Sequence, residues 1–220
     1  MRRLAFALSL ALALAQPARS CEVALIFTID VSGSVDAAEY RLQIDGLAAA
    51  LRDPIIADAL EVARAAVAVM QWSGTGQQQV SIPWTRLEEP ADIAAFAARV
   101  IRLPRAYERS DTAVGEMLAR AVAEFDDRVA DCRRRVIDVS GDGQTNAGRP
   151  SGPERTRAAR AGIEINAIAI EMSGQALPVT QYFRRHVITP GGFVMTSRTH
   201  RDYPDTLRAK IFRELVRPMG

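Results

Sequence analysis

The stretch that decides the fold is VALIFTIDVSGS, residues 23–34 of the chain. Its first part, Val23–Ile29, is an apolar run, which is typical of a strand buried on both faces. Three oxygen-bearing side chains follow at alternate positions: Asp30, Ser32 and Ser34. In open parallel sheets, ligands bind beyond the carboxyl ends of the strands. The stretch therefore predicts a buried central strand and a polar site at its end.

Strand-like and helix-like segments alternate through the rest of the chain. Asp36 and Glu39 have the spacing of a capping box, which predicts that a helix begins there. Apolar runs predict strands, and apolar residues at helical spacing predict helices. The expected strands are Val23–Ile29, Ala65–Trp72, Val80–Leu87, Arg135–Val139, Ile163–Ile170 and Gly192–Thr196. The expected helices are the segments after Asp36 and after Thr112, together with Pro90–Ile101, Pro153–Ala161, Val179–Val187 and Asp205–Val216.

This alternation predicts an α/β fold: a doubly wound, mainly parallel sheet with helices on both faces. Val80–Leu87 is the expected exception, because a short Gly-containing turn links it to Ala65–Trp72 as an antiparallel hairpin partner. Pro83 then places this strand at the sheet edge, since proline cannot donate to the ladder. A length of 220 residues suits a single domain, which we expect to cover residues 21–220.

Residues 1–20 predict a signal peptide. Arg2 and Arg3 precede the apolar run Leu4–Ala15, which is too short to span a bilayer. Two sites with small residues follow, and we favour cleavage after Ser20. A buried first helix is the alternative, and the lack of any polar face argues against it. We therefore expect a secreted or periplasmic protein.

Charge excludes some classes of partner. The formal net charge of +2 includes Arg2, Arg3 and Arg19, without which 25 basic residues face 26 acidic ones. A nearly neutral chain gives no electrostatic case for binding nucleic acid or an anionic membrane. No later stretch is long and apolar enough to predict a transmembrane helix. The sequence does not indicate the oligomeric state.

The two cysteines, Cys21 and Cys132, predict a disulfide, because such a pair in an exported protein is usually bonded. Cys21 lies nine residues before Asp30, and Cys132 lies ten before Asp142. If the two segments are neighbouring parallel strands, the cysteines start side by side. The bond would close a loop of roughly 110 residues, worth about 4–5 kcal/mol on the chain-entropy model. Two free thiols are the alternative.

Oxygen donors are the chemistry that the polar turn offers. Asp30, Ser32 and Ser34 supply one carboxylate and two hydroxyls, which suit Mg²⁺, Mn²⁺ or Ca²⁺. The candidate loops contain no histidine or cysteine, which disfavours zinc. His186 and His200 are isolated in the sequence and are not expected to be ligands.

Three motifs together resemble a known site. They are DVSGS at residues 30–34, SDTAVG at 110–115 and VSGDG at 139–143. They resemble, in order and interval, the metal-ion-dependent adhesion site of the von Willebrand factor A family. The resemblance extends from about Val23 to Val216. The stretch EYRLQ at 39–43 and the secreted form also resemble a bacterial subgroup, domain of unknown function 1194.

The resemblance implies a metal site. Ser32, Ser34 and Thr112 would contact the ion directly, while Asp30 and Asp142 would hold it through waters or at longer range. This chain departs from the family at one position, because Gly141 stands where the family usually has the threonine of Thr-Asp-Gly. That departure removes a hydroxyl beside the site and leaves the carboxylate of Asp142.

The donor count suggests a function. Two carboxylates balance one divalent cation, and about five oxygen donors leave Mg²⁺ short of the six that it prefers. An open coordination position attracts an anionic oxygen, and the family's usual occupant is an Asp or Glu of a partner protein. We therefore expect a metal-dependent protein-binding domain, with Mg²⁺ as the first candidate ion, and not an enzyme.

Structural roles are the alternative for each site residue. Thr112 suits a helix N-cap, and Asp142 before a glycine suits a turn. Ser32 and Ser34 suit caps of the first helix. Asp138 falls inside a predicted strand, about 13 Å from Asp142, so it needs a partner of its own, such as an arginine.

Two other functions stay open. Ser140 lacks the flanking glycines of a serine-hydrolase turn, and the chain has no phosphate-binding loop. A metal-dependent hydrolase or phosphatase built on Asp30 is the best enzyme alternative, although it would need an acidic residue where Ser32 stands. A metal-free scaffold that binds through its helices or its edge strand is the third possibility.

Overall fold

The structure is a computed structural model that describes residues 20–108, 110–171 and 178–216. Within these residues, the strands form one six-stranded sheet with the order β3-β2-β1-β4-β5-β6. The strands are β1 (Val23–Asp30), β2 (Ala66–Trp72), β3 (Gln78–Arg86), β4 (Arg134–Gly141), β5 (Ile163–Ile170) and β6 (Val194–Ser197). All neighbours pair in parallel except β2 and β3, which are antiparallel. This confirms the predicted fold class and the edge position of β3.

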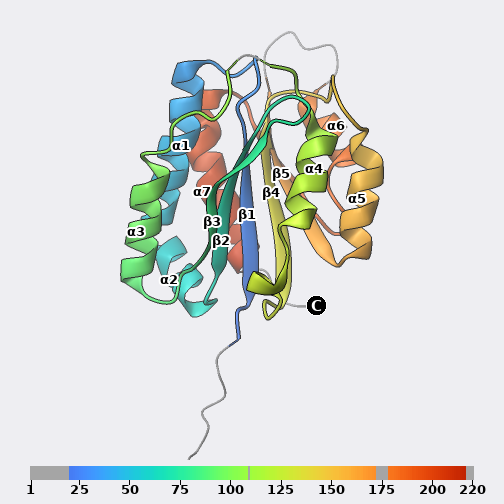
Figure 1. The fold of residues 1–220 in the computed structure, drawn as a ribbon. Helices are drawn as coiled ribbons and strands as arrows, with labels where there is room; N and C mark the ends of the chain where they lie inside the picture. Colours follow the sequence, from blue (N-terminus) through green and yellow to red (C-terminus); the bar gives the residue numbers. More distant parts are fainter. Residues whose placement is uncertain (1–19, 109, 172–177, 217–220) are drawn as a thin grey trace, which may run out of the picture.

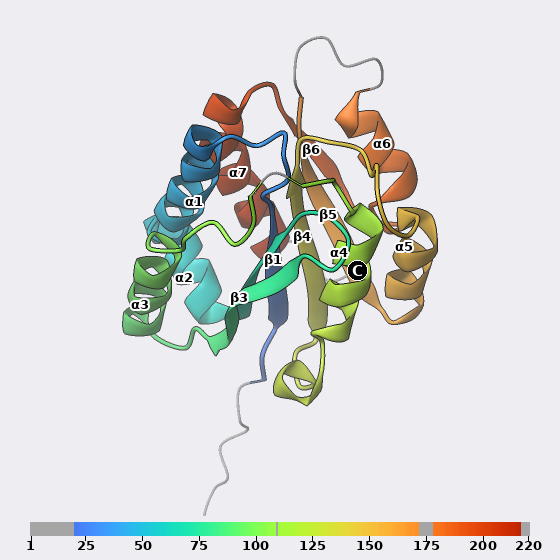
Figure 2. The same ribbon diagram turned by 45° about the horizontal axis from the view of Figure 1, so that its top comes forward.

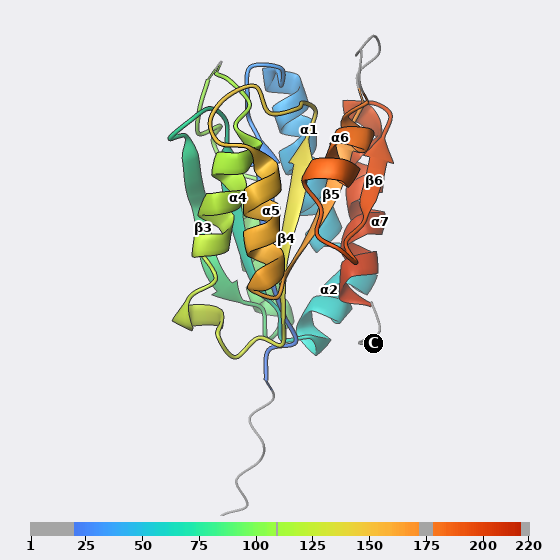
Figure 3. The same cartoon turned by 90° about the vertical axis from the view of Figure 1, so that its right-hand side faces the viewer.

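Helices cover both faces of the sheet (Figures 1 and 3). One face is covered by α1 (Ala37–Leu51), α2 (Pro54–Val62), α3 (Pro90–Val100) and α7 (Tyr203–Leu215). The other is covered by α4 (Val114–Ala123), α5 (Ser151–Arg160) and α6 (Val179–His186), which face the viewer in Figure 3. Alternate residues of β1 enter the two cores: Leu25 and Phe27 pack on the first, and Ile26 packs on the second.

Local sequence explains where α1 begins. Asp36 caps the helix by accepting from the backbone N–H of Glu39, and the Glu39 side chain accepts from the backbone N–H of Asp36. Both bonds of the predicted capping box are therefore present. They matter for the site because they fix the chain immediately after the Ser32–Ser34 turn.

One helix was missing from the prediction. The segment Pro54–Val62 forms α2, which begins where Asp53 accepts from the backbone N–H groups of Ile55 and Ile56. Its apolar residues do not lie on one stripe, since Ile56 is buried while Ile55 and Val62 are exposed. The segment therefore lacks the helical periodicity from which the other helices were predicted.

The foot of the sheet is closed by a disulfide between Cys21 and Cys132. The cysteines precede β1 and β4, which pair directly, and Arg133 N–H donates to the carbonyl of Cys21 at 2.9 Å. The predicted bond, and the predicted neighbourhood of the two strands, are thereby confirmed. The predicted signal peptide lies, apart from Ser20, outside the described residues.

The strand order reverses between β1 and β4. From the end of β1 the chain passes to α1 on one face, and from the end of β4 it passes to α5 on the other. The two connections therefore diverge and leave room between them at the carboxyl edge of the sheet. This edge is the top of Figure 1 and is turned toward the viewer in Figure 2.

Asp138 has a partner that differs from the expected arginine. The ammonium nitrogen of Lys210 lies 2.6 Å from Asp138 Oδ2 and 2.7 Å from Glu214 Oε1. All three side chains are buried between β4 and α7. Lys210 is the only lysine of the chain, and it lies 72 residues from Asp138 in sequence, so no local pattern pointed to the pair.

Candidate metal centre

Three loops bring the five predicted ligands together at the carboxyl edge of β1 and β4 (Figure 2). Thr112 Oγ1 donates to Ser32 Oγ at 3.2 Å, and Ser32 Oγ lies 3.2 Å from Ser34 Oγ. Ser34 Oγ in turn donates to Asp142 Oδ1 at 2.6 Å. Asp30 Oδ1 accepts from the backbone N–H of Ser32 at 2.8 Å. Side chains that lie up to 112 residues apart in the sequence thus form one polar cluster.

The hydroxyl groups converge instead of serving as helix caps. The N-cap of α1 is Asp36, so neither Ser32 nor Ser34 caps that helix. The N-cap of α4 is Ala113, and the Thr112 hydroxyl points to Ser32. Ser32 and Thr112 are buried while Ser34 is exposed, so the cluster opens to solvent on the Ser34 side.

Neighbouring loops hold the Ser32–Ser34 turn in place. Gly33 N–H donates to the carbonyl of Ser110 at 2.8 Å, which joins the first loop to the second. Arg105 Nη2 donates to the carbonyls of Val31 and Ser32 at 2.8 and 2.9 Å. Sequence reasoning missed Arg105, because an arginine in a loop carries no local signal of such a clamp.

Asn146 performs a similar task for Thr112. Its side-chain Oδ1 accepts from Thr112 N–H at 2.8 Å, and its own N–H donates to the carbonyl of Thr112 at 2.9 Å. Asn146 belongs to the loop that follows Asp142, so it joins the second and third loops. The hydroxyl of Thr112 is thereby fixed toward Ser32 without using its own backbone groups.

Burial places the two carboxylates under electrostatic stress. Burial, and then the negative charge of Asp142, raise the pKa of Asp30 to about 7. Burial also raises the pKa of Asp142, against the opposing effect of the Ser34 hydroxyl. Asp30 Oδ2 is buried and has no hydrogen-bond partner among the described residues. A cation beside these groups would lower both pKa values and supply the missing partner.

Gly141 explains the state of Asp30 Oδ2. A Cβ atom at position 141 would lie 3.1 Å from that oxygen and 3.3 Å from the ring of Trp72. Phe183 lies at the same place, 3.4 Å from such a Cβ. Two aromatic rings therefore take the space where the family has a threonine, and the hydroxyl that would stand beside Asp30 is absent.

A histidine that sequence reasoning set aside lies next to the cluster. His200 follows β6 in the short turn η2 (His200–Asp202), and its Nε2 is 3.9 Å from Asp142 Oδ2. Its Nδ1 is 3.0 Å from Glu39 Oε1. Both histidines are remote from the motifs in sequence, and only the parallel pairing of β5 and β6 brings His200 to this edge.

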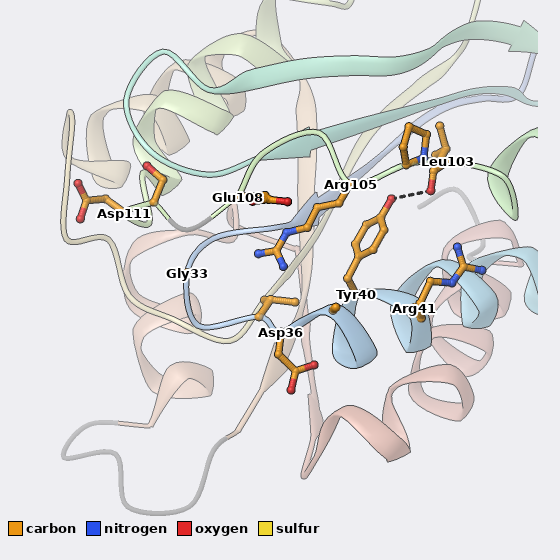
Figure 4. A pocket seen from close by; sticks show the side chains of 12 residues that line it. Gly33, Asp36, Tyr40, Arg41, Leu103, Arg105, Glu108 and Asp111 are labelled. Atoms are coloured by element: carbon orange, nitrogen blue, oxygen red, sulfur yellow. Dashed lines mark hydrogen bonds between the residues drawn. The ribbon is translucent and has the colours of Figure 1, made fainter.

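A cavity of about 1180 Å³ opens beside the Ser32–Ser34 turn. It lies between the start of α1 and the loop that contains Arg105, as Figure 4 shows. Tyr40 forms one wall and donates its hydroxyl proton to the carbonyl of Leu103 at 3.0 Å. The walls carry both charges, with Arg41 and Arg105 basic and Asp36, Glu108 and Asp111 acidic. A bound chain that reached the cluster from this side would pass over the cavity.

The donor set fits a hard divalent ion. It consists of three hydroxyls and two carboxylates, and one carboxylate oxygen is buried without a partner in the described part of the chain. Among the described residues, no group of three or more His, Cys, Asp or Glu side chains is arranged to hold a metal. Any ion here therefore depends on the hydroxyls as well as the acids.

Solved structures share this fold. Proximal thread matrix protein 1 from the mussel byssus is 18% identical with a TM-score of 0.65, over 87% of this chain and 47% of that one. A von Willebrand factor type A structure from Catenulispora acidiphila is 20% identical with a TM-score of 0.60, over 89% and 43%. The pilus adhesin SpaC from Lactobacillus rhamnosus GG is 12% identical with a TM-score of 0.62, over 90% and 31%. The chain thus spans less than half the length of each.

These likenesses define the class: the chain is a domain of the von Willebrand factor A fold, similar in structure to an adhesin and a matrix protein. The family is narrower. The profile described as "Protein of unknown function (DUF1194)" matches residues 20–219, so the chain belongs to the DUF1194 family. No curated protein matches the chain.

One of the similar structures carries a metal. A second structure of the mussel protein is described with a zinc-occupied MIDAS motif and is 17% identical to this chain, with a TM-score of 0.60 over 87% and 46%. The metal-ion-dependent adhesion site of that protein therefore holds zinc. At this identity the comparison with our chain shows the fold alone.

Proposed function

We propose that this protein is a metal-dependent protein-binding domain whose ion completes its coordination with an Asp or Glu carboxylate of a partner. The observation that carries the proposal is the convergence of Ser32, Ser34 and Thr112 hydroxyls, within 3.2 Å of one another along the chain of contacts, beside the partnerless Asp30 Oδ2. Such a cluster has the donors of a cation site and lacks the base that acid–base catalysis requires.

Each residue has a defined task. Ser32, Ser34 and Thr112 would hold the ion with neutral oxygens, while Asp30 and Asp142 would balance its charge. When bound, the ion supplies a Lewis-acidic position for an anionic oxygen. Mg²⁺ is the ion that these five oxygen donors alone favour, with Mn²⁺ and Ca²⁺ as alternatives.

Binding should be linked to protonation of the site. In the metal-free protein Asp30 has a pKa of about 7, so a proton competes with the ion at neutral pH. The ion displaces that proton when it binds. The exposed Ser34 marks the side from which a partner carboxylate would approach.

Export supports a role outside the cytoplasm. The disulfide between Cys21 and Cys132 is typical of oxidising compartments. No helix among the described residues is both long and apolar enough to cross a membrane. These features agree with a periplasmic or secreted binding domain that carries the predicted signal peptide.

Calorimetry with Mg²⁺ tests the site. We expect wild type to bind Mg²⁺ and Asp30→Asn, which is nearly isosteric, to lose at least about tenfold in affinity, because a buried charge that balances the ion is removed. Asp131→Asn is the matched control, since Asp131 is an exposed aspartate paired with Arg86. Equal affinity of wild type and Asp30→Asn would refute the metal site.

Capture then tests the partner. The same three proteins, immobilised and exposed to a periplasmic extract with Mg²⁺ or with chelator, should retain a common acidic partner only for wild type and Asp131→Asn with Mg²⁺. Retention that ignores both the chelator and Asp30→Asn would favour the metal-free scaffold instead.

A further inference from the structure

His200 is buried against the metal cluster in a defined orientation. Its side chain is 6% exposed, and it lies between Glu39 of α1 and Asp142 at the end of β4. The two ring nitrogens face opposite carboxylates, at 3.0 Å for Nδ1 and 3.9 Å for Nε2. Nε2 is buried and has no hydrogen-bond partner among the described residues. A buried ring nitrogen in that state is unusual and calls for a partner.

Glu39 fixes the ring. Its Oε1 lies 3.0 Å from His200 Nδ1, and its Oε2 accepts from the backbone N–H of Asp36 at 2.8 Å. The contact at Nδ1 places the ring proton there and leaves the lone pair on Nε2, directed at Asp142. Histidines that bind metals in proteins are usually held in this way, by a carboxylate on the second nitrogen.

The distance to Asp142 suits a shared ion. Zinc bonds to histidine nitrogen and carboxylate oxygen are about 2.0–2.2 Å, so one ion reaches both atoms when they lie within roughly 4.3 Å. The observed distance from Nε2 to Asp142 Oδ2 is 3.9 Å, too long for a hydrogen bond. His200 also borders a hollow of about 590 Å³, from which an ion would enter.

We propose that His200 is a nitrogen ligand for the ion that Asp142 holds, and that the site therefore selects ions that accept nitrogen, Zn²⁺ above all, over Mg²⁺. This inference rests on the proposed metal site and refines its ion. The sequence argument against zinc assumed that no histidine reaches the three loops. The return of the chain after β6 removes that assumption.

The decisive quantity is the ratio of Zn²⁺ to Mg²⁺ affinity, because most protein sites bind Zn²⁺ more tightly than Mg²⁺. We expect His200→Ala to lower the Zn²⁺ affinity more than about tenfold while the Mg²⁺ affinity changes little, and Glu39→Gln to lower the Zn²⁺ affinity by about tenfold. His186→Ala is the matched control. It removes the chain's other histidine, which packs against Tyr182 on α6 and should leave the ratio unchanged.

Spectroscopy gives a second readout. With two histidines in the chain, long-range ¹H–¹⁵N spectra resolve each ring. Zn²⁺ should shift Nε2 of His200 and leave His186 unchanged. His200→Gln, compared by circular dichroism with wild type, guards against a variant that fails to fold.

The outcomes separate the two proposals. A Zn²⁺ to Mg²⁺ ratio that stays the same in His200→Ala overturns this inference and leaves the metal site intact. An equal loss for both ions also overturns it, because His200 would then merely position Asp142. If wild type binds neither ion, both proposals fail. If Zn²⁺ binding needs His200 but not Asp30, this inference stands and the adhesion-type site does not.

Discussion

Replacing Lys210 by methionine should destabilise the protein strongly. Lys210 lies within 2.7 Å of carboxylate oxygens of both Asp138 and Glu214, and all three side chains are buried. Burial raises the pKa of Glu214 to about 8, so Glu214 carries a proton at pH 7. The remaining ionised pair is Lys210 with Asp138. Lys210→Met keeps the length of the side chain and leaves the Asp138 carboxylate buried without its cation.

The expected cost follows from that arrangement. Removing one member of a buried ion pair typically costs about 3–5 kcal/mol, because the other charge stays buried without compensation. Small domains have about 5–15 kcal/mol of stability in total, so the loss is a large fraction. Replacing both charges by apolar side chains of similar size is often neutral. The double variant Asp138→Leu with Lys210→Met should therefore recover most of the loss.

Urea unfolding at pH 7, followed by circular dichroism, measures these differences. Arg41→Met is the matched control: its pair with Asp45 is about half exposed, and such pairs contribute at most about 1 kcal/mol. If Lys210→Met costs no more than Arg41→Met, the buried pair does not stabilise α7 on the sheet. If the double variant is as unstable as Lys210→Met, the loss comes from packing and not from charge.

Two further predictions concern stability. Replacing Cys21 and Cys132 by serine frees a loop with a sequence separation of 111 and should lower the free energy of unfolding by about 4–5 kcal/mol in urea titrations; a loss below about 1 kcal/mol would contradict the loop-closure argument. The pKa of Glu214 is raised from 4.5 to about 8 in the folded state, so its stabilising contribution is complete below pH 4.5 and is lost as the pH rises through 8. Between these limits the group lowers the free energy of unfolding by up to about 1.4 kcal/mol per pH unit, and Glu214→Gln, which has no proton to release, should show a flatter profile than wild type.

The sequence predicted most of the fold because the sheet is built from strongly local signals. Buried parallel strands are apolar runs, and β5 (Ile163–Ile170) is found at the predicted bounds. The strand order around β1 was also accessible, since the cysteines have nearly equal offsets from Asp30 and Asp142. The helix α2 was not, because its apolar residues do not follow one stripe.

The site was predictable to the extent that its residues lie in motifs at strand ends. The structure brings together Asp30, Ser32, Ser34, Thr112 and Asp142, as the resemblance implied. Arg105 and His200 were not predictable, because their roles arise from loops that meet only in the folded chain. The metal itself stays a prediction, and the resemblance to a zinc-bearing mussel protein adds a reason to test it.

A comparison of two buried aspartates argues for the ion on physical grounds. Asp138 on β4 and Asp30 on β1 are both almost fully buried, and a buried carboxylate needs hydrogen bonds or a cation. The protein supplies the cation for Asp138 from within, as Lys210. Asp30 has no cationic side chain in the described contacts, and its pKa is raised to about 7. A chain that pairs one buried acid internally and leaves the other beside three converging hydroxyls is arranged to take its second cation from solution.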